Sequence, residues 1–140
     1  MEAARGDYVL FLNNDAFLPT DALDRFAEDF ASFPQAALIG GQLVGENGVP
    51  QRSAGVAPTF FSELGLVRRK QPDVSNSPQP VEVETLVGAC MAFRRALVDT
   101  AGRLDEDSFL RRQGRQVVVN PRVRITHHAS QGSKYPCYSA

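Results

Sequence analysis

The sequence predicts an α/β domain in which strands and helices pack in layers. Two kinds of segment support this: short apolar runs rich in β-branched residues, and one clearly amphipathic stretch between the first two of them. Turn signals containing Gly, Pro or Asn separate these segments. A length of 140 residues suits one domain, and 43% hydrophobic with 22% charged residues excludes disordered and collagen-like classes.

The first apolar run predicts a strand, and the stretch after it predicts a helix. Tyr8–Leu12 is bounded by polar residues, so we expect a buried strand in a parallel sheet covered on both faces. Thr20 or Asp21 is a plausible helix N-cap, and the helix is expected to end near Pro34. Its expected apolar face is Ala22, Leu23, Phe26, Ala27 and Phe30, opposite the charged residues Asp24, Arg25, Glu28 and Asp29.

The middle of the chain predicts a second strand followed by irregular structure. We expect a buried strand over 36–44, broken at Gly40-Gly41, and then a turn at Glu46-Asn47-Gly48 because Asn-Gly tolerates positive φ. Apolar residues between 60 and 66 suit a short helix. Residues 72–80 predict an exposed loop.

The rest of the chain returns to strand-like patterns. The expected elements are a strand over 81–93, a helix over 94–101, strands over 116–119 and 123–126 separated by Asn120-Pro121, and an irregular tail over 129–140. We find no internal repeats, so residues 1–140 form a single domain in this interpretation.

Charge and cysteine content limit the classes of binding partner and the cellular compartment that the sequence suits. The net charge is −1 and the Lys and Arg residues are scattered, which excludes the basic face of a nucleic-acid binder. Two cysteines do not make a disulfide framework and fit a reducing cytosol. No apolar stretch approaches the roughly 20 residues needed to cross a bilayer, and the N-terminus does not have the pattern of a signal peptide. The sequence is compatible with a peripheral contact with a membrane.

Polar residues that follow strands are the candidates for chemistry. Asn13-Asn14-Asp15 comes directly after the first strand, where ligands collect in open α/β sheets, and Asp15 suits Mg²⁺ or Mn²⁺ bridging to a diphosphate. The same residue types favour turns, so a turn or cap is the alternative. His127-His128 follows the last strand and offers an imidazole ligand, or else a surface feature. Neighbouring residues point to opposite faces, so at most one of the two histidines enters a given site.

A carboxylate cluster near residue 105 is a third candidate. Asp105-Glu106-Asp107 has the chemistry of a general base. The alternative is a solvated loop or the start of a helix.

Taken in order, four segments resemble the bacterial rhamnosyltransferase-like branch of glycosyltransferase family 2. They are 4–15 (ARGDYVLFLNND), 87–95 (VGACMAFRR), 102–106 (GRLDE) and 120–127 (NPRVRITH). Each segment alone is a weak signal, whereas their order over about four-fifths of the chain is specific.

The resemblance implies a partial GT-A fold, with a mixed sheet flanked by helices, and a divalent cation, Mg²⁺ or Mn²⁺. It implies inverting transfer of a sugar from a nucleotide-sugar donor to a glycan or lipid-linked acceptor in cell-envelope polysaccharide synthesis, in the cytoplasm at the inner face of the membrane. Asp15 resembles the metal-binding residue of a variant Asp-x-Asp motif that includes Asn13 and Asn14, and His127 resembles a metal-facing histidine with His128 as its competitor. The segment that lines the sugar and acceptor side is Gly88, Ala89 and Cys90.

Two departures from the family pattern lead us to expect that this chain alone transfers no sugar. Family members carry roughly a hundred residues before the Asp-x-Asp strand, about half a domain, for nucleotide binding. The stretch that supplies their catalytic base is missing between Leu110 and Arg111, which leaves Glu106 and Asp107 as weak substitutes. Two other hypotheses stay open: a non-catalytic binding module that retains the metal-binding residues, and an unrelated small α/β domain whose motifs coincide by chance.

Overall fold

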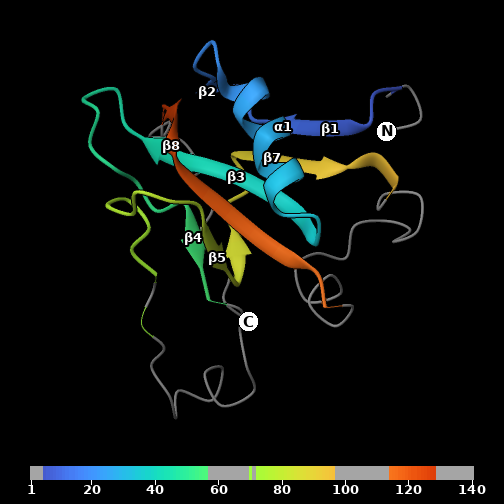
Figure 1. Cartoon of the computed structure of the whole chain (residues 1–140). Coiled ribbons are helices and arrows are strands. Elements are labelled where there is room, and N and C mark those ends of the chain that lie inside the picture. The colour runs from blue at the N-terminus through green and yellow to red at the C-terminus, as the bar shows by residue number, and fades with distance from the viewer. Residues whose placement is uncertain (1–4, 57–69, 71, 97–113, 129–140) are drawn as a thin grey trace, which may run out of the picture.

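A mixed sheet forms the centre of the molecule in a computed structural model that describes residues 5–56, 70, 72–96 and 114–128 (Figure 1). Five of the six strands of this sheet follow the order β1-β7-β3-β8-β2, and the sixth, β5, pairs with β8. Two further short strands, β4 and β6, form a separate pair. The described elements are β1 (Tyr8–Leu12), β2 (Ala16–Phe17), α1 (Ala22–Ser32), β3 (Ala36–Val44), β4 (Ala54–Gly55), β5 (Val81–Val83), β6 (Thr85–Leu86), β7 (Cys90–Arg94) and β8 (Gln116–His127).

The strand directions bring several strand ends to one edge of the sheet. β7 runs antiparallel to both of its neighbours, β1 and β3, while β3 and β8 run parallel. As a result β1, β3 and β8 all point the same way (Figure 1). We call the side where these three strands end the carboxyl edge. The structure therefore confirms the expected α/β class and the expected mixed sheet.

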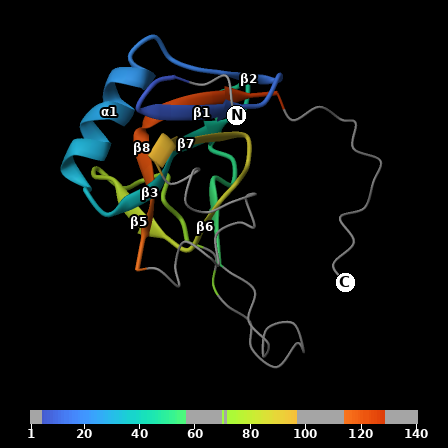
Figure 2. The ribbon, with the colours of Figure 1, turned by 90° about the vertical axis from the view of Figure 1, so that its right-hand side faces the viewer.

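Both faces of the sheet are covered. Helix α1 lies on one face, and the β4–β6 pair lies on the other (Figure 2). Consecutive β8 residues alternate between the two cores: Val118 packs on the α1 side, whereas Val117 and Val119 pack on the opposite side. This alternation is the period of two that a strand imposes on its side chains.

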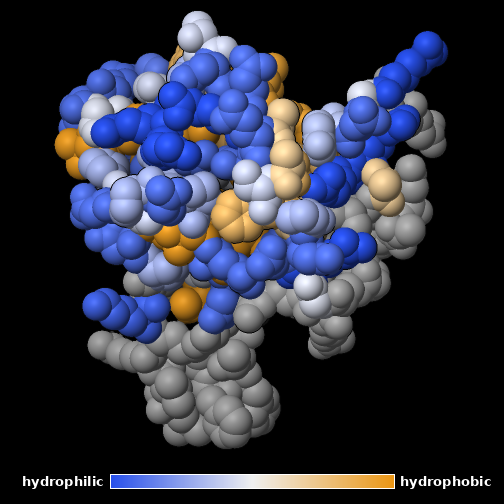
Figure 3. All heavy atoms as spheres, viewed as in Figure 1, coloured by the Kyte–Doolittle hydropathy of each residue, from blue (hydrophilic) through white to orange (hydrophobic). Residues whose placement is uncertain are grey.

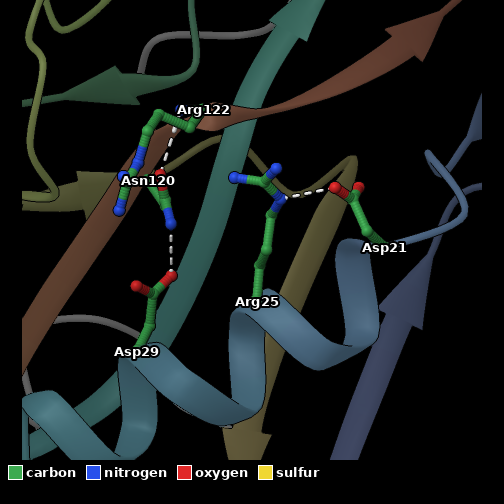
Figure 4. Close-up of polar contacts among 5 residues, drawn as sticks. All are labelled: Asp21, Arg25, Asp29, Asn120 and Arg122. Carbon is green, nitrogen blue, oxygen red and sulfur yellow. Dashed lines mark hydrogen bonds and ion pairs between the residues drawn. The ribbon is translucent and has the colours of Figure 1, made fainter.

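Helix α1 agrees with the amphipathic pattern except in two respects: the apolar residues Leu23 and Ala27 are exposed, and one charged residue is buried. Phe26 and Phe30 are almost fully buried, as expected, but Leu23 is 61% exposed. Asp21 occupies the N-cap position, yet its carboxylate accepts no hydrogen bond from the helix backbone. It binds Arg25 instead, with Oδ2 at 2.6 Å from Nε (Figure 4).

The second difference is Asp29, which was expected on the charged outer face and is in fact 5% exposed. Its Oδ2 accepts a hydrogen bond of 2.7 Å from Nδ2 of Asn120 in β8 (Figure 4). Burial raises the pKa of Asp29, and the hydrogen bond from Asn120 opposes that shift. The helical period alone does not predict that Asp29 is buried, because its hydrogen-bond partner Asn120 lies 91 residues away in the sequence.

The expectation for β1 is wrong in its pairing and burial, although the strand bounds are confirmed. β1 runs antiparallel to β7, and it is not a buried strand of a parallel sheet. Tyr8 is 42% exposed and Leu12 is 40% exposed. The reason is that β1 ends the strand order of the described sheet, so it has a strand neighbour on one side only.

Strands β3 and β8 are each continuous where the sequence predicted a break. β3 is buried at every residue, and Gly40-Gly41 does not interrupt it. The two expected strands over 116–119 and 123–126 are one strand of 12 residues, β8. Gly41 pairs with Asn120 but Gln42 pairs with Arg124, so residues 121–123 form a bulge in β8.

The remaining expectations have different outcomes. The turn at 46–48 is confirmed, since Gly48 has φ of 73° and its N–H donates to the carbonyl of Gly45 at 2.8 Å. The strand expected over 81–93 is divided into β5, β6 and β7. Residues 72–80 contain neither helix nor strand, although Val74 is buried. The short helix between 60 and 66, most of the helix over 94–101 and the tail over 129–140 lie outside the described residues.

The surface on the α1 side is largely hydrophilic, with small hydrophobic areas between polar ones (Figure 3). Within the described residues, no helix is long and apolar enough to span a membrane.

Candidate functional site

Asp15 and His127 meet at the carboxyl edge. The short segment Asn13–Asp15 carries the chain from β1, at one end of the strand order, to β2 at the other. Because β2 pairs with the end of β8, Ala16 lies opposite His127. This register places Oδ1 of Asp15 3.5 Å from Nε2 of His127. The two residues expected to bind a metal are therefore neighbours in space, 112 positions apart in the chain.

The carboxylate of Asp15 turns one oxygen into the protein. Oδ1 is buried and accepts no hydrogen bond from the described residues, although the whole side chain keeps 27% of its exposure. The separation of 3.5 Å from Nε2 of His127 exceeds the usual length of a charge-assisted hydrogen bond, about 2.7–2.9 Å. Buried polar atoms normally have a partner. Oδ1 can therefore still accept a hydrogen bond or bind a cation.

Gln51 contacts His127 from the other side and was not predicted. Its Oε1 lies 3.1 Å from Nδ1 of the ring, and its Nε2 donates to the backbone carbonyl of the same histidine at 3.2 Å. Gln51 follows the turn after β3, which returns the chain alongside the end of that strand. It belongs to no motif, so nothing in the sequence indicates its place at this edge.

His128 points away from the pair formed by Asp15 and His127. Its Nδ1 contacts Oε1 of Glu46, and its ring meets the ring of Phe17 at a centroid distance of 5.0 Å. The backbone N–H of His128 does reach the site, donating to the carbonyl of Asp15 at 2.9 Å. Only one of the two adjacent histidines thus directs its ring toward Asp15, as the alternation of side chains along a strand requires.

The other expected substrate-binding residues lie along the same edge. The backbone N–H of Asn13 donates to the carbonyl of Ala89 at 2.9 Å, which joins the two motif segments. Asn13, Asn14 and Gly88 are exposed, whereas Ala89 and Cys90 are buried. A Cβ atom at Gly88 would meet no atom within 4 Å, so open space lies in front of this glycine.

Cys90 has the properties of a core residue. Burial raises the pKa of its thiol to about 12. At neutral pH the thiol therefore stays protonated, and a protonated thiol is neither a good nucleophile nor a metal ligand.

The carboxylates expected as substitutes for the general base are not among the described residues. Asp105, Glu106 and Asp107, together with the junction of Leu110 and Arg111, lie outside the described residues.

Asp15 and His127 suit one divalent cation that takes its other ligands from elsewhere. In the described ranges no group of three or more His, Cys, Asp and Glu side chains converges on one point. Two ligand atoms of one ion, each at about 2.1 Å from it, lie about 3.0–3.4 Å apart in octahedral or tetrahedral geometry. The observed 3.5 Å is close to that separation. An ion that binds substrate phosphates and water needs only one or two protein carboxylates or imidazoles.

Among the described residues, two hollows lie away from this edge. One of about 140 Å³ is apolar and lies between α1 and β1, with Leu23, Phe26 and Leu10 in its wall. The other, of about 400 Å³, lies at the start of β1 beside Arg94 and Arg95. Arg94 is occupied there, since its guanidinium donates to the carbonyl of Phe30 at 2.6 Å.

Comparisons with known proteins bear on the fold. No protein-family model matches the chain, and no curated protein matches it. The crystal structure of A197 from STIV is similar, with a TM-score of 0.52 and 10% sequence identity. The similarity covers 94% of this chain and 71% of that chain. At this level of identity the likeness concerns the fold alone.

Proposed function

We propose that this chain is a glycosyltransferase-like domain of GT-A type, and that Asp15 and His127 hold a divalent cation against the diphosphate of a nucleotide-sugar donor. We call these two residues the cation corner. The observation that carries the proposal is the buried Oδ1 of Asp15, which lacks a hydrogen bond and faces Nε2 of His127 at 3.5 Å. The same two residues are the ones that the resemblance to glycosyltransferase family 2 assigns to metal binding.

The surroundings of the cation corner suit a phosphate-bearing ligand. Asn13 and Asn14 are exposed beside it and offer amide donors, and Gly88 leaves room for a ligand to approach the backbone. A bound cation would neutralise the negative charge that grows on the leaving diphosphate when the sugar is transferred. In this proposal the reaction of the domain type is inverting transfer to a glycan or a lipid-linked sugar in cell-envelope polysaccharide synthesis. This chain alone is expected not to transfer the sugar, because the family's catalytic base is missing between Leu110 and Arg111.

A cation titration tests the proposal directly. The signal of free Mn²⁺ in electron paramagnetic resonance disappears as the ion binds, so a titration gives the affinity of the protein for the ion. We expect one bound Mn²⁺ per chain, and at least about tenfold weaker binding in Asp15→Asn because a neutral amide is a poorer ligand than a carboxylate. Unchanged free Mn²⁺ in the presence of millimolar protein would refute the cation corner.

The two adjacent histidines provide a matched control. His127→Asn should weaken Mn²⁺ binding, whereas His128→Asn should leave it unchanged, because the ring of His128 turns to Glu46. Equal effects of the two substitutions would show that the ion does not bind between Asp15 and His127.

A second candidate function is a non-catalytic module that binds a cation and a nucleotide sugar without transferring the sugar. The departure of the sequence from the family pattern between Leu110 and Arg111 favours it, because the expected base is missing there. Release of nucleoside diphosphate and glycosylation of an acceptor would be measured with a panel of nucleotide sugars and Mn²⁺. Transfer that depends on Asp15 identifies an enzyme, and Mn²⁺-dependent binding of the nucleotide sugar without transfer identifies the module.

A further inference from the structure

The side chain of Gln51 contacts both the ring and the backbone of His127. Its Nε2 donates to the carbonyl oxygen of His127 at 3.2 Å, and its Oε1 lies 3.1 Å from Nδ1 of the ring. A carbonyl oxygen only accepts hydrogen bonds, so the amide nitrogen must face it and the amide oxygen must face the ring. An amide oxygen also only accepts. Nδ1 of His127 therefore carries the hydrogen of this contact.

That assignment decides what the opposite side of the ring presents to Asp15. A neutral imidazole with its hydrogen on Nδ1 has a lone pair on Nε2. In that neutral form the lone pair of Nε2 faces the buried Oδ1 of Asp15 at 3.5 Å. Two acceptors held face to face in a partly buried place attract a cation.

We propose that Gln51 is the positioning residue of the cation corner: it selects the tautomer of His127 that leaves Nε2 free to bind a metal, and it holds the ring toward Asp15. This inference rests on the proposed function. It adds a residue that belongs to none of the motif segments.

The backbone of Gln51 is anchored independently of its side chain. Its N–H donates to the carbonyl of Leu43 at 2.8 Å, and its carbonyl accepts from Nε2 of Gln42 at 2.7 Å and from Oγ of Ser53 at 3.1 Å. Substitution of the side chain therefore leaves these three bonds in place. A variant at this position reports on His127 rather than on the course of the loop.

Two substitutions separate the roles of the Gln51 side chain. Gln51→Met has a similar length but neither hydrogen bond, so we expect the Kd for Mn²⁺ to rise about 10- to 100-fold, the usual effect of removing a group that orients a metal-binding histidine. Gln51→Glu loses the bond to the backbone carbonyl but retains an acceptor for the Nδ1 hydrogen. We expect it to recover most of the affinity, because a carboxylate is a common partner of a metal-binding histidine.

Spectroscopy supplies a readout that a merely structural role would not change. In metal-free protein labelled with ¹⁵N-histidine, we expect the hydrogen of His127 on Nδ1 and a bare Nε2, and in Gln51→Met a mixture of the two tautomers. With Mn²⁺ bound, the electron spin echo should show modulation from a coordinated nitrogen in the wild type, lost in His127→Asn. Thermal denaturation of each variant confirms that it is folded.

The outcomes distinguish the two proposals. Wild-type protein that binds no Mn²⁺ overturns the cation corner, and the role of Gln51 with it. Wild-type protein that binds Mn²⁺ while Gln51→Met binds it equally well overturns the role of Gln51 alone. A neutral His127 ring that carries its hydrogen on Nε2 instead of Nδ1 in the metal-free wild type also overturns the role of Gln51 alone.

Discussion

Replacing Asn120 with alanine should destabilise the fold by removing a buried side-chain hydrogen bond between α1 and β8. Asn120 is 1% exposed. Its Nδ2 donates to Oδ2 of Asp29 at 2.7 Å, and its Oδ1 accepts from the backbone N–H of Arg122 at 3.0 Å within the β8 bulge (Figure 4). Asn120→Ala removes both partners at once. It leaves a buried carboxylate without a donor, and an N–H of the bulge without an acceptor.

The expected loss is about 3 kcal/mol of unfolding free energy. A hydrogen bond to a charged group contributes about 1.5–3 kcal/mol, and a neutral one about 1 kcal/mol. Small domains have about 5–15 kcal/mol in total, so the midpoint of a urea titration at pH 7, followed by circular dichroism, should fall clearly. Asp29→Asn is the matched control. It retains an oxygen for the Asn120 amide and removes the buried charge, so its stability should equal or exceed that of the wild type.

The pH dependence of the same pair supplies a second check. Burial raises the pKa of Asp29 above that of the unfolded chain, so the folded state binds this proton more tightly. The stabilisation that comes from protonated Asp29 is complete below the pKa of an aspartate in the unfolded chain, about 3.9. It is lost as the pH rises through the pKa of Asp29 in the folded protein. The wild type should therefore gain stability relative to Asp29→Asn as the pH falls from 7 toward 4.

Two results would refute this reasoning. One is an Asn120→Ala variant whose unfolding free energy at pH 7 lies within about 0.5 kcal/mol of the wild type, the scatter of an ordinary surface substitution. The other is a difference between the wild type and Asp29→Asn that does not change with pH.

Two further predictions concern the close packing behind the carboxyl edge. Gly41→Ala would place a Cβ atom 2.4 Å from the backbone oxygen of Val123, so we expect a loss of about 1–3 kcal/mol in urea unfolding, while Gly88→Ala, which meets open space, should change stability little. Equal midpoints for the two variants would contradict this account. In a Cys137→Ser background, Cys90 should not react with a maleimide at pH 7 and should react fully in denaturant, because burial raises the pKa of its thiol to about 12. Rapid labelling of the folded protein would show that the thiol is accessible.

Local pattern was sufficient for the elements whose structure depends on neighbours in the chain. The helical period over 22–32 located α1 because helix contacts repeat within four residues. The turn at 46–48 was found because Gly48 meets a local need for positive φ. The bounds of β1 followed from the polar residues on either side of its apolar run.

Pairing between strands lay beyond such local pattern. Periodicity does not state which strand lies beside β1, so the sequence did not show its antiparallel pairing or its partial exposure. Asn120-Pro121 is typical of a turn, yet it lies inside one long strand, because the bulge opposite Gly41 absorbs the extra residues. Asp29 is buried for a similar reason: its partner comes from a strand far along the chain.

For the candidate site, the sequence by itself determined the chemistry available: a carboxylate and an imidazole, each placed directly after a strand. Only the tertiary structure decided that Asp15 and His127 meet, that His128 turns to Glu46, and that Gln51 holds the ring. The physical reason is that a strand's sequence encodes which of its residues share a face, whereas the register between strands sets which residues become neighbours. That register is fixed by the packing of the whole sheet.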